Sequence, residues 1–314
     1  MKKLYLKLII FFSFFVLLFL CEIYLRFYVG LGDPILYKTS NVYGYSIKPN
    51  QDVQRRGNSI IINNLGLRDI KKNVEIENCK KKIFFLGDSL TYGGSKIETN
   101  ELFSFLIGKY LNYDCIFVVA VNGWGMQNIE KFMKAKNLFY KGDYVILLIE
   151  ENFTRGLRRI HSYSSMTQKK HFFALYELTN YYMKSLLFKI ENADSLNEEK
   201  KENLISINFA IESLQSLIER IENRQGKIFI AISPSKTILK NIKEENLKSD
   251  TYYYYDYLLK KLEEKKINTN YLANDLKKFS SSKIDTLFLD EIHYSKKGHS
   301  YLSNYLIEKI AKNE

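Results

Sequence analysis

Residues 83–93 read IFFLGDSLTYG, an apolar run followed by a glycine and two polar residues. A continuous apolar run of this length, ended by Gly87, is typical of a strand buried on both faces. We expect it to be the first strand of a parallel sheet. Ligands and catalytic groups in open α/β sheets gather just beyond the carboxyl ends of the strands. Ser89 is therefore a candidate for chemistry.

A serine hydroxyl is a weak nucleophile unless a nearby base removes its proton. Four histidines are present to act as that base: His161, His171, His293 and His299. Only His293 has an aspartate, Asp290, three residues before it, in the segment LFLDEIHYSKKGHSYL. One short turn can hold both of these side chains. His161 and His171 lack a nearby acidic residue to orient the ring, and we expect His299 to make capping or surface contacts at the start of the last helix.

Four short blocks of the chain resemble the GDSL or SGNH family of esterases and lipases. Gly87-Asp88-Ser89-Leu90 matches the first signature of that family, and Asp290-x-x-His293 matches the last. Between them, Gly123 in AVNGWG and Asn152 in IEENF stand where the family has a glycine and an asparagine after its second and third strands. The third block departs from the usual Gly-x-Asn-Asp, because Glu150 and Glu151 precede Asn152. These acidic residues would disfavour an oxyanion if they faced the pocket.

The resemblance implies a serine esterase with a Ser-His-Asp triad. Ser89 would attack an ester carbonyl, and His293 would take its proton and return it to the leaving alcohol. Asp290 would orient the imidazole. The oxyanion would be bound by the backbone N–H groups of Ser89 and Gly123 and by the side-chain amide of Asn152. The resemblance implies neither a metal nor an organic cofactor.

Alternating strands and helices are predicted after the first strand. We expect strands at residues 115–121, 144–149, 227–232 and 269–272, and helices at residues 127–140, 196–224, 250–265 and 296–312. Asn100 is expected to cap a helix directly after the first strand. This βαβαβ order implies right-handed crossovers and a parallel sheet covered on both faces. With the resemblance, it predicts an α/β fold: a three-layer α/β/α sandwich around a parallel five-stranded sheet, as in flavodoxin-like SGNH hydrolases.

Residues 1–28 are expected to form a membrane anchor. Lys2, Lys3 and Lys7 precede the uncharged run Leu8–Cys21, and extension through residues 23–28 reaches the roughly 20 residues of a bilayer span. No small-residue cleavage site follows. The lysines place the N-terminus in the cytoplasm, so we expect a single-pass membrane protein with an extracytoplasmic catalytic domain. A cleaved signal peptide is the alternative and implies the same compartment.

Residues 29–80 are expected to form a strand-and-loop leader, and residues 81–314 the hydrolase-like domain. Within the leader, Arg68 either fixes the leader by an ion pair or lines the substrate approach, and we favour the first interpretation. An aromatic segment at about 153–196 has two interpretations. It is either an insertion over the site that contributes to an acyl or glycan pocket, or a helix that packs on the core.

The three cysteines fit no zinc-binding spacing. Cys79 and Cys115 each precede an expected strand, and neighbouring parallel strands would bring their amino ends together. We therefore hypothesise that they form a disulfide if the domain is extracytoplasmic. Two unpaired core cysteines are the alternative. Cys21 lies in the apolar N-terminal segment.

The formal net charge of +12 is spread along the chain, without an arginine-rich block or a nucleic-acid-binding motif. We therefore predict no nucleic-acid partner. Attraction to anionic lipids or acidic glycans is the alternative use of this charge. The expected partners are the membrane, through the N-terminal helix, and an ester substrate on a cell-surface glycan or a lipid. The sequence sets no expectation for the oligomeric state.

Two other functions are consistent with the same residues. An O-acyltransferase that modifies cell-surface glycans would use the same triad, because an acyl group on Ser89 can pass to a sugar hydroxyl if the pocket excludes water. The third candidate is a catalytically inactive surface or binding protein on an SGNH scaffold. The acidic residues Glu150 and Glu151 favour this candidate.

Overall fold

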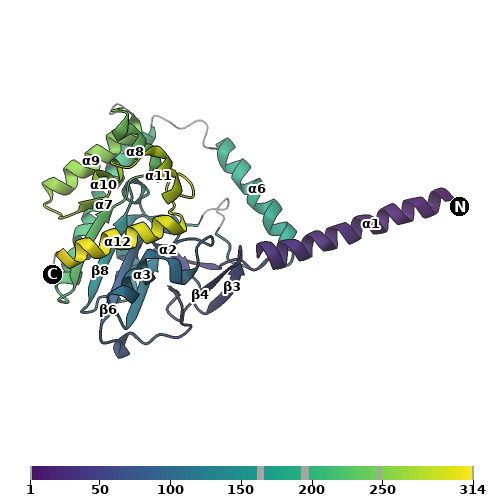
Figure 1. The fold of residues 1–314 in the computed structure, drawn as a ribbon, viewed down its shortest axis with the longest axis horizontal. Coiled ribbons are helices and arrows are strands. Elements are labelled where there is room, and N and C mark those ends of the chain that lie inside the picture. Colours follow the sequence, from purple (N-terminus) through teal and green to yellow (C-terminus); the bar gives the residue numbers. More distant parts are fainter. Residues whose placement is uncertain (1, 161–165, 192–197, 246–248, 313–314) are drawn as a thin grey trace.

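One mixed sheet with helices over both faces forms the body of the protein. The computed structural model describes residues 2–160, 166–191, 198–245 and 249–312. Within them the sheet has eight strands, in the order β10-β9-β8-β6-β7-β5-β4-β3. Helices α3 (Phe103–Tyr110) and α12 (Lys296–Lys312) pack on each other over one face. Helices α4 (Met126–Ala135) and α7 (Glu198–Glu222) pack together over the other face (Figure 1).

Five neighbouring strands of this sheet are parallel. β6 (Lys82–Gly87) lies between β7 (Cys115–Ala120) and β8 (Asp143–Leu148), and β9 (Lys227–Ile232) and β10 (Asn270–Tyr271) follow beyond β8. The side chains of residues 83–86 in β6 are fully buried, as expected for a strand covered on both faces. The predicted α/β class and the positions of these strands are confirmed.

The prediction of a five-stranded sheet is wrong, because three antiparallel strands from the leader extend it to eight. These are β3 (Gln51–Arg55), β4 (Asn58–Ile62) and β5 (Arg68–Asp69). β5 pairs with β7 through Arg68 and Val118. Without β5, β7 would be an edge strand with unpaired backbone groups, so the leader closes that edge. A separate hairpin, β1 (Tyr37–Ser40) and β2 (Gly44–Ile47), completes the leader.

Arg68 fixes the leader to the loop that follows α2 (Ser89–Tyr92), and it is fully buried. Its guanidinium donates hydrogen bonds to three backbone carbonyl oxygens, those of Tyr92, Gly94 and Ile97, at 2.5–2.8 Å. Its Nε donates to Thr99 Oγ1 at 3.1 Å. Arg68 thus has the structural role that we favoured, but carbonyl oxygens take the place of the expected carboxylate partner.

The remaining helices surround this framework. They are α1 (Lys2–Tyr24), α5 (Glu150–Thr154), α6 (Ala174–Glu191), α8 (Lys236–Lys243), α9 (Asp250–Glu264), α10 (Ala273–Leu276) and α11 (Ser281–Leu287). The prediction that Asn100 caps a helix is wrong, because Asn100 lies in a 3₁₀ turn and α3 begins at Phe103. His299 takes that role instead, since its Nδ1 accepts a 3.3 Å hydrogen bond from the Phe103 N–H.

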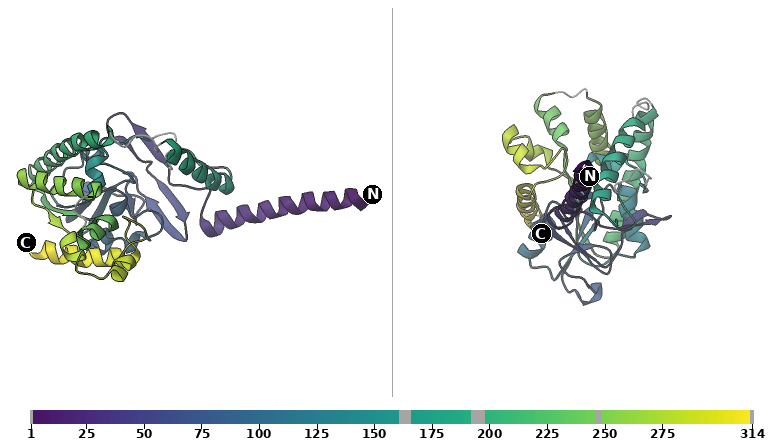
Figure 2. Two further views of the ribbon diagram at one scale, coloured as in Figure 1. Left: turned by 90° about the horizontal axis from the view of Figure 1, so that it is seen from above. Right: turned by 90° about the vertical axis from the view of Figure 1, so that its right-hand side faces the viewer.

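α1 projects from the body as a single long rod (Figure 2). Together with the π-helical turn that follows it, α1 contains a stretch, Lys3–Val29, that is long and apolar enough to cross a membrane. Most of its large apolar side chains are exposed. Such an N-terminal helix is compatible with a membrane span and also with a signal sequence.

Cys79 and Cys115 form a disulfide, with their Cα atoms 5.8 Å apart. Cys115 pairs in register with Lys82, so the disulfide lies at the amino ends of β6 and β7. The hypothesis that these two cysteines pair is therefore confirmed. Cys21 carries a free thiol.

We expect loss of this disulfide to lower the free energy of unfolding by about 4 kcal/mol, because the bond closes a loop with a sequence separation of 36 residues. The measurement is denaturant unfolding of the full chain in detergent, comparing the wild type with Cys79→Ser. Cys21→Ser is the matched control and should leave the unfolding midpoint unchanged. Equal midpoints for Cys79→Ser and the wild type would contradict the prediction.

Candidate functional site

Ser89 lies at the carboxyl end of the central strand, where β6 passes directly into α2. Gly87 makes this turn possible: a Cβ there would lie 2.2 Å from Thr91 Oγ1 and 2.7 Å from the Leu147 carbonyl oxygen. Asp88 caps α2, and its Oδ1 accepts a 3.0 Å hydrogen bond from the Leu90 N–H. These contacts hold the Ser89 side chain at the carboxyl end of β6, the position expected from the sequence.

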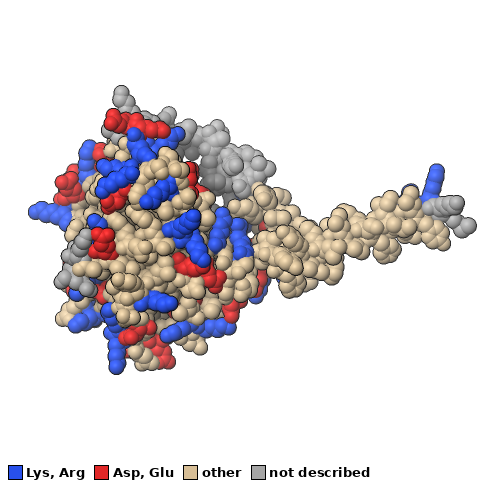
Figure 3. Space-filling model, viewed as in Figure 1, with Lys and Arg blue, Asp and Glu red and all other residues tan. Residues whose placement is uncertain are grey.

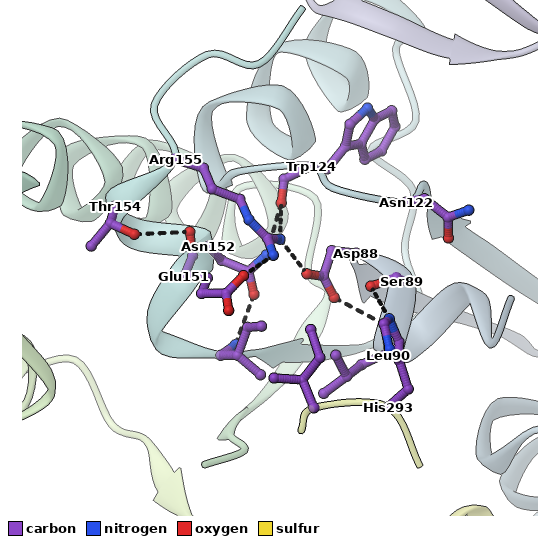
Figure 4. Close-up of polar contacts among 12 residues, drawn as sticks. Asp88, Ser89, Leu90, Asn122, Trp124, Glu151, Asn152, Thr154, Arg155 and His293 are labelled. Atoms are coloured by element: carbon purple, nitrogen blue, oxygen red, sulfur yellow. Dashed lines mark hydrogen bonds and ion pairs between the residues drawn. The ribbon is translucent and has the colours of Figure 1, made fainter. Parts of the chain in front are cut away.

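Ser89, His293 and Asp290 form a continuous hydrogen-bonded chain. His293 Nε2 lies 2.8 Å from Ser89 Oγ, and His293 Nδ1 lies 3.0 Å from both carboxylate oxygens of Asp290. Figure 4 shows the His293 ring directed at the serine hydroxyl. Asp290 Oδ1 also accepts hydrogen bonds from the backbone N–H groups of Ile292 and His293. One tight turn therefore holds the carboxylate and the imidazole together.

The charge state of Asp290 suits an orienting role. Burial opposes its ionisation, but the hydrogen bonds from the His293 and Ile292 backbone and from the His293 ring outweigh burial and lower the pKa of Asp290 below 3.8. An ionised carboxylate beside Nδ1 favours the tautomer with the proton on that nitrogen. Nε2 is then free to accept the proton of Ser89.

A cavity of about 450 Å³ opens at this triad. Its lining includes Ser89, His293, Gly123, Arg155 and Tyr181. Gly123 has a left-handed backbone with φ of +72°, and a Cβ there would lie 3.2 Å from the Tyr45 hydroxyl. The expected site residues Ser89, Gly123, Asp290 and His293 thus border one cavity, and they come from three separate parts of the chain.

Asn152, the fifth expected site residue, lies behind this cavity rather than in its lining. Its side chain is fully buried. Its amide nitrogen donates to the Trp124 carbonyl oxygen at 2.8 Å, and its Oδ1 accepts from the Ile149 N–H at 2.7 Å. Asn152 therefore caps α5 and ties the end of β8 to the turn after β7.

Arg155 is a residue of the site that sequence reasoning missed. Arg155 lines the cavity. Its guanidinium bonds Asp88 Oδ2 at 2.7 Å and pairs with Glu151 (Figure 4). Burial opposes its charge, but Asp88 and Glu151 outweigh burial and raise the pKa of Arg155 above its usual value. The one local signal for this residue was its spacing of four residues from Glu151, which allows an ion pair on one helical face. The contact with Asp88 spans 67 residues and leaves no local pattern.

Neither acidic residue of the third block borders the cavity. Burial raises the pKa of Glu150, which favours its neutral form, and its side chain lies beside Ser235. The Glu151 carboxylate is paired with Arg155. The geometry therefore removes the direct repulsion of an oxyanion that these residues would cause if they faced the pocket.

The other described histidines are not placed as bases for Ser89. His299 borders the cavity but is 1% exposed and stacks on Phe103, with ring centroids 5.9 Å apart. His171 contacts the Tyr176 ring, and His161 lies outside the described residues. Within the described ranges, no group of three or more His, Cys, Asp or Glu side chains is arranged to hold a metal ion.

Comparisons with known proteins give structural similarities only. No protein-family model matches the chain, and no curated protein matches its sequence. A solved structure of a member of the lipolytic protein G-D-S-L family from Veillonella parvula DSM 2008 is 13% identical, covers 73% of this chain and 97% of its own, and has a TM-score of 0.40. The structure of a possible lipase from Chitinophaga pinensis DSM 2588 is 13% identical, covers 74% of this chain and 98% of its own, and has a TM-score of 0.40.

The buried imidazole of His299 predicts a loss of stability in mild acid. Burial lowers the pKa of His299 from 6.5 to about 3, so the folded state keeps the ring neutral while the unfolded chain takes up a proton below pH 6.5. The contribution of His299 to the free energy of unfolding is therefore complete above pH 6.5 and is lost progressively as the pH drops toward 3. Between pH 7 and pH 5 we expect a loss of about 2 kcal/mol from His299 alone.

Urea unfolding of the full chain in detergent at the two pH values measures this effect. His299→Gln is the comparison, because glutamine keeps an acceptor for the Phe103 N–H but does not titrate. Its unfolding free energy should fall by about 2 kcal/mol less than that of the wild type. Parallel losses in the two proteins would show that His299 is not responsible.

Proposed function

We propose that this chain is a membrane-anchored serine esterase that hydrolyses O-acyl esters of a cell-surface glycan or a lipid. The observation that supports it best is the geometry of the triad. Ser89 Oγ lies 2.8 Å from His293 Nε2, and His293 Nδ1 lies 3.0 Å from Asp290. This arrangement is the one that activates a serine hydroxyl for attack on an acyl carbon.

The reaction would proceed in two acyl transfers. His293 removes the proton of Ser89 as the hydroxyl oxygen bonds to the ester carbonyl carbon, and Asp290 stabilises the imidazolium that forms. His293 then protonates the leaving alcohol, and the acyl group remains on Ser89. Water, activated by the same imidazole, releases the carboxylic acid.

The oxyanion of each tetrahedral intermediate needs hydrogen-bond donors. The backbone N–H groups of Ser89 and Gly123 are two proposed donors. Asn152 is the third that the family motif implies, but one of its two amide N–H groups binds the Trp124 carbonyl oxygen and its side chain lies outside the cavity lining. Arg155 is the rival third donor, because this charged residue lines the cavity. Such a donor contributes about 3–4 kcal/mol of transition-state stabilisation.

The compartment and the domain limits are part of this proposal. Residues 1–28 would be the anchor, with Lys2, Lys3 and Lys7 on the cytoplasmic side. Residues 29–80 would be the leader, and residues 81–314 the catalytic domain. The Cys79–Cys115 disulfide supports an extracytoplasmic body, since such bonds persist in oxidising compartments.

We expect the full chain in detergent to release p-nitrophenol from acetyl and longer acyl esters. Ser89→Ala should lower kcat by about two or more orders of magnitude, because it removes the nucleophile. Ser216→Ala, a serine on α7 bonded to Glu130, is the matched control and should keep full activity. Turnover that appears only with a sugar acceptor would assign acyl transfer instead. A wild type as inactive as Ser89→Ala under both conditions would contradict catalysis.

A second comparison separates the two rival donors. We expect Arg155→Met to lower kcat by about 10²–10³-fold with a smaller change in KM, and Arg155→Lys to recover part of the rate because it keeps the charge. Asn152→Ala should lower the thermal midpoint of unfolding and leave kcat nearly unchanged, since both polar atoms of Asn152 bind backbone groups. A loss of 10² or more in kcat for Asn152→Ala, at an unchanged midpoint, would identify Asn152 as the donor.

A further inference from the structure

We infer that α6 is an interfacial helix that lies on the membrane surface beside the end of α1 and holds the catalytic cavity there. The ester substrate is then an amphiphile carried by the bilayer, such as an acylated lipid. This inference rests on the proposed anchor and esterase, and it adds the surface from which the substrate is taken.

The start of α6 is fixed to the end of α1. The Glu22 carboxylate accepts hydrogen bonds from the N–H groups of Ala174 and Leu175 at 2.8 and 3.0 Å. Arg26 pairs with Glu22 and donates to the Phe172 carbonyl oxygen at 2.8 Å. A small apolar cluster of Leu25, Leu31 and Ala174 surrounds these contacts. The two helices are therefore joined where α1 meets the body.

One face of α6 is turned toward the body and the cavity. Glu177 forms a 2.6 Å ion pair with Arg55, and both side chains are 13% exposed. The Glu177 carboxylate also accepts a 2.6 Å hydrogen bond from the Gly32 N–H. Tyr181, one helical turn later on the same face, lines the catalytic cavity. α6 thus forms part of the wall of the site.

Apolar and aromatic side chains without such contacts cover the other face. Tyr176, Tyr182 and Met183 are 57%, 65% and 63% exposed, and Phe172, just before the helix, is 85% exposed. We call these four residues the interfacial patch. Residues 178–183 contain no charged side chain. An exposed apolar face beside an apolar rod is typical of a membrane contact rather than of a solvated helix.

The direction of α6 agrees with a place at the bilayer surface. In Figures 1 and 2, α6 leaves the end of α1 and runs crosswise to it. The 27 residues of Lys3–Val29 are about 40 Å long as a helix, close to the full thickness of a bilayer with its headgroups. The end of α1 and the start of α6 then lie at headgroup level, where tyrosines gather.

The distribution of charge also places the bilayer surface near the end of α1. Figure 3 shows lysines, arginines and acidic residues scattered over the body, whereas α1 is free of them along most of its length. Tyr24, the last residue of α1, and Phe27 and Tyr28 in the π-helical turn that follows are exposed aromatic residues at the same end of the rod. A membrane that reaches these residues also reaches α6, and the cavity bordered by Tyr181 lies directly behind it.

Spin-label depth measurements on the full chain in phosphatidylcholine–phosphatidylglycerol vesicles test this placement without any use of activity. Single labels are attached in a Cys21→Ser background at Met183→Cys, at Phe15→Cys within α1, and at Tyr253→Cys on α9, without reductant so that the disulfide stays closed. Labels at 15 and 183 should collide more with oxygen than with a water-soluble nickel chelate, and the label at 253 should do the reverse. The label at 183 should lie roughly 5–10 Å deep.

The three labels distinguish the possible failures. A label at 183 that behaves like the label at 253, while the label at 15 lies in the bilayer, overturns the inference and leaves the anchor intact. A water-exposed label at 15 overturns the anchor and the inference together.

An activity ratio tests the consequence for the substrate. The rate on a long-chain acyl ester embedded in the same vesicles is divided by the rate on soluble p-nitrophenyl acetate. In the variant Tyr176→Ser/Tyr182→Ser/Met183→Ser this ratio should fall at least about tenfold. An unchanged ratio overturns delivery through α6, and a wild type without activity on either ester overturns the proposed esterase while the depth data still decide the place of α6.

Discussion

The pairing of β6 on both edges is the constraint from which the rest of the site follows. Its neighbours β7 and β8 are in parallel register with it, and its side chains from Ile83 to Leu86 are wholly buried. At its carboxyl end Gly87 leaves no room for a side chain, so the chain turns at once into α2. Ser89 is consequently fixed to the centre of the sheet, and every other group of the site is placed relative to it.

The ends of three neighbouring strands are tied together around that point. Asp88, after β6, binds Arg155, which follows β8. Asn152, also after β8, binds the carbonyl oxygen of Trp124, which follows β7. A site braced in this way needs little rearrangement when charge develops on the substrate, which is the condition under which fixed donors are most effective. Arg68 extends the bracing to the leader, since it holds the loop behind Ser89.

The sequence predicted those features that depend on local pattern. Strand 227–232 and helix 296–312 appear with the expected bounds, because apolar runs, glycines and helical spacing are local signals. The short Asp290–His293 turn is local too. The three extra strands of the sheet were missed. The pattern of apolar and polar residues within the leader does not show whether its strands pair with the main sheet, or at which edge. The orientation of Asn152 was likewise missed, and the cap by His299 was expected at the start of its own helix rather than on α3, because these contacts span 28 and 196 residues.

The disulfide has a consequence for proteolysis. Cys79 and Cys115 close a covalent ring that contains Ser89 and the loop at residues 93–97, where Lys96 is exposed. A protease that cuts after Lys96 would separate Ser89 and His293 in sequence but would leave the two fragments linked through sulfur. The body would also remain attached to α1. Separation of residues 97–314 from α1 would then require reduction as well as cleavage, so a single cut after Lys96 does not release them.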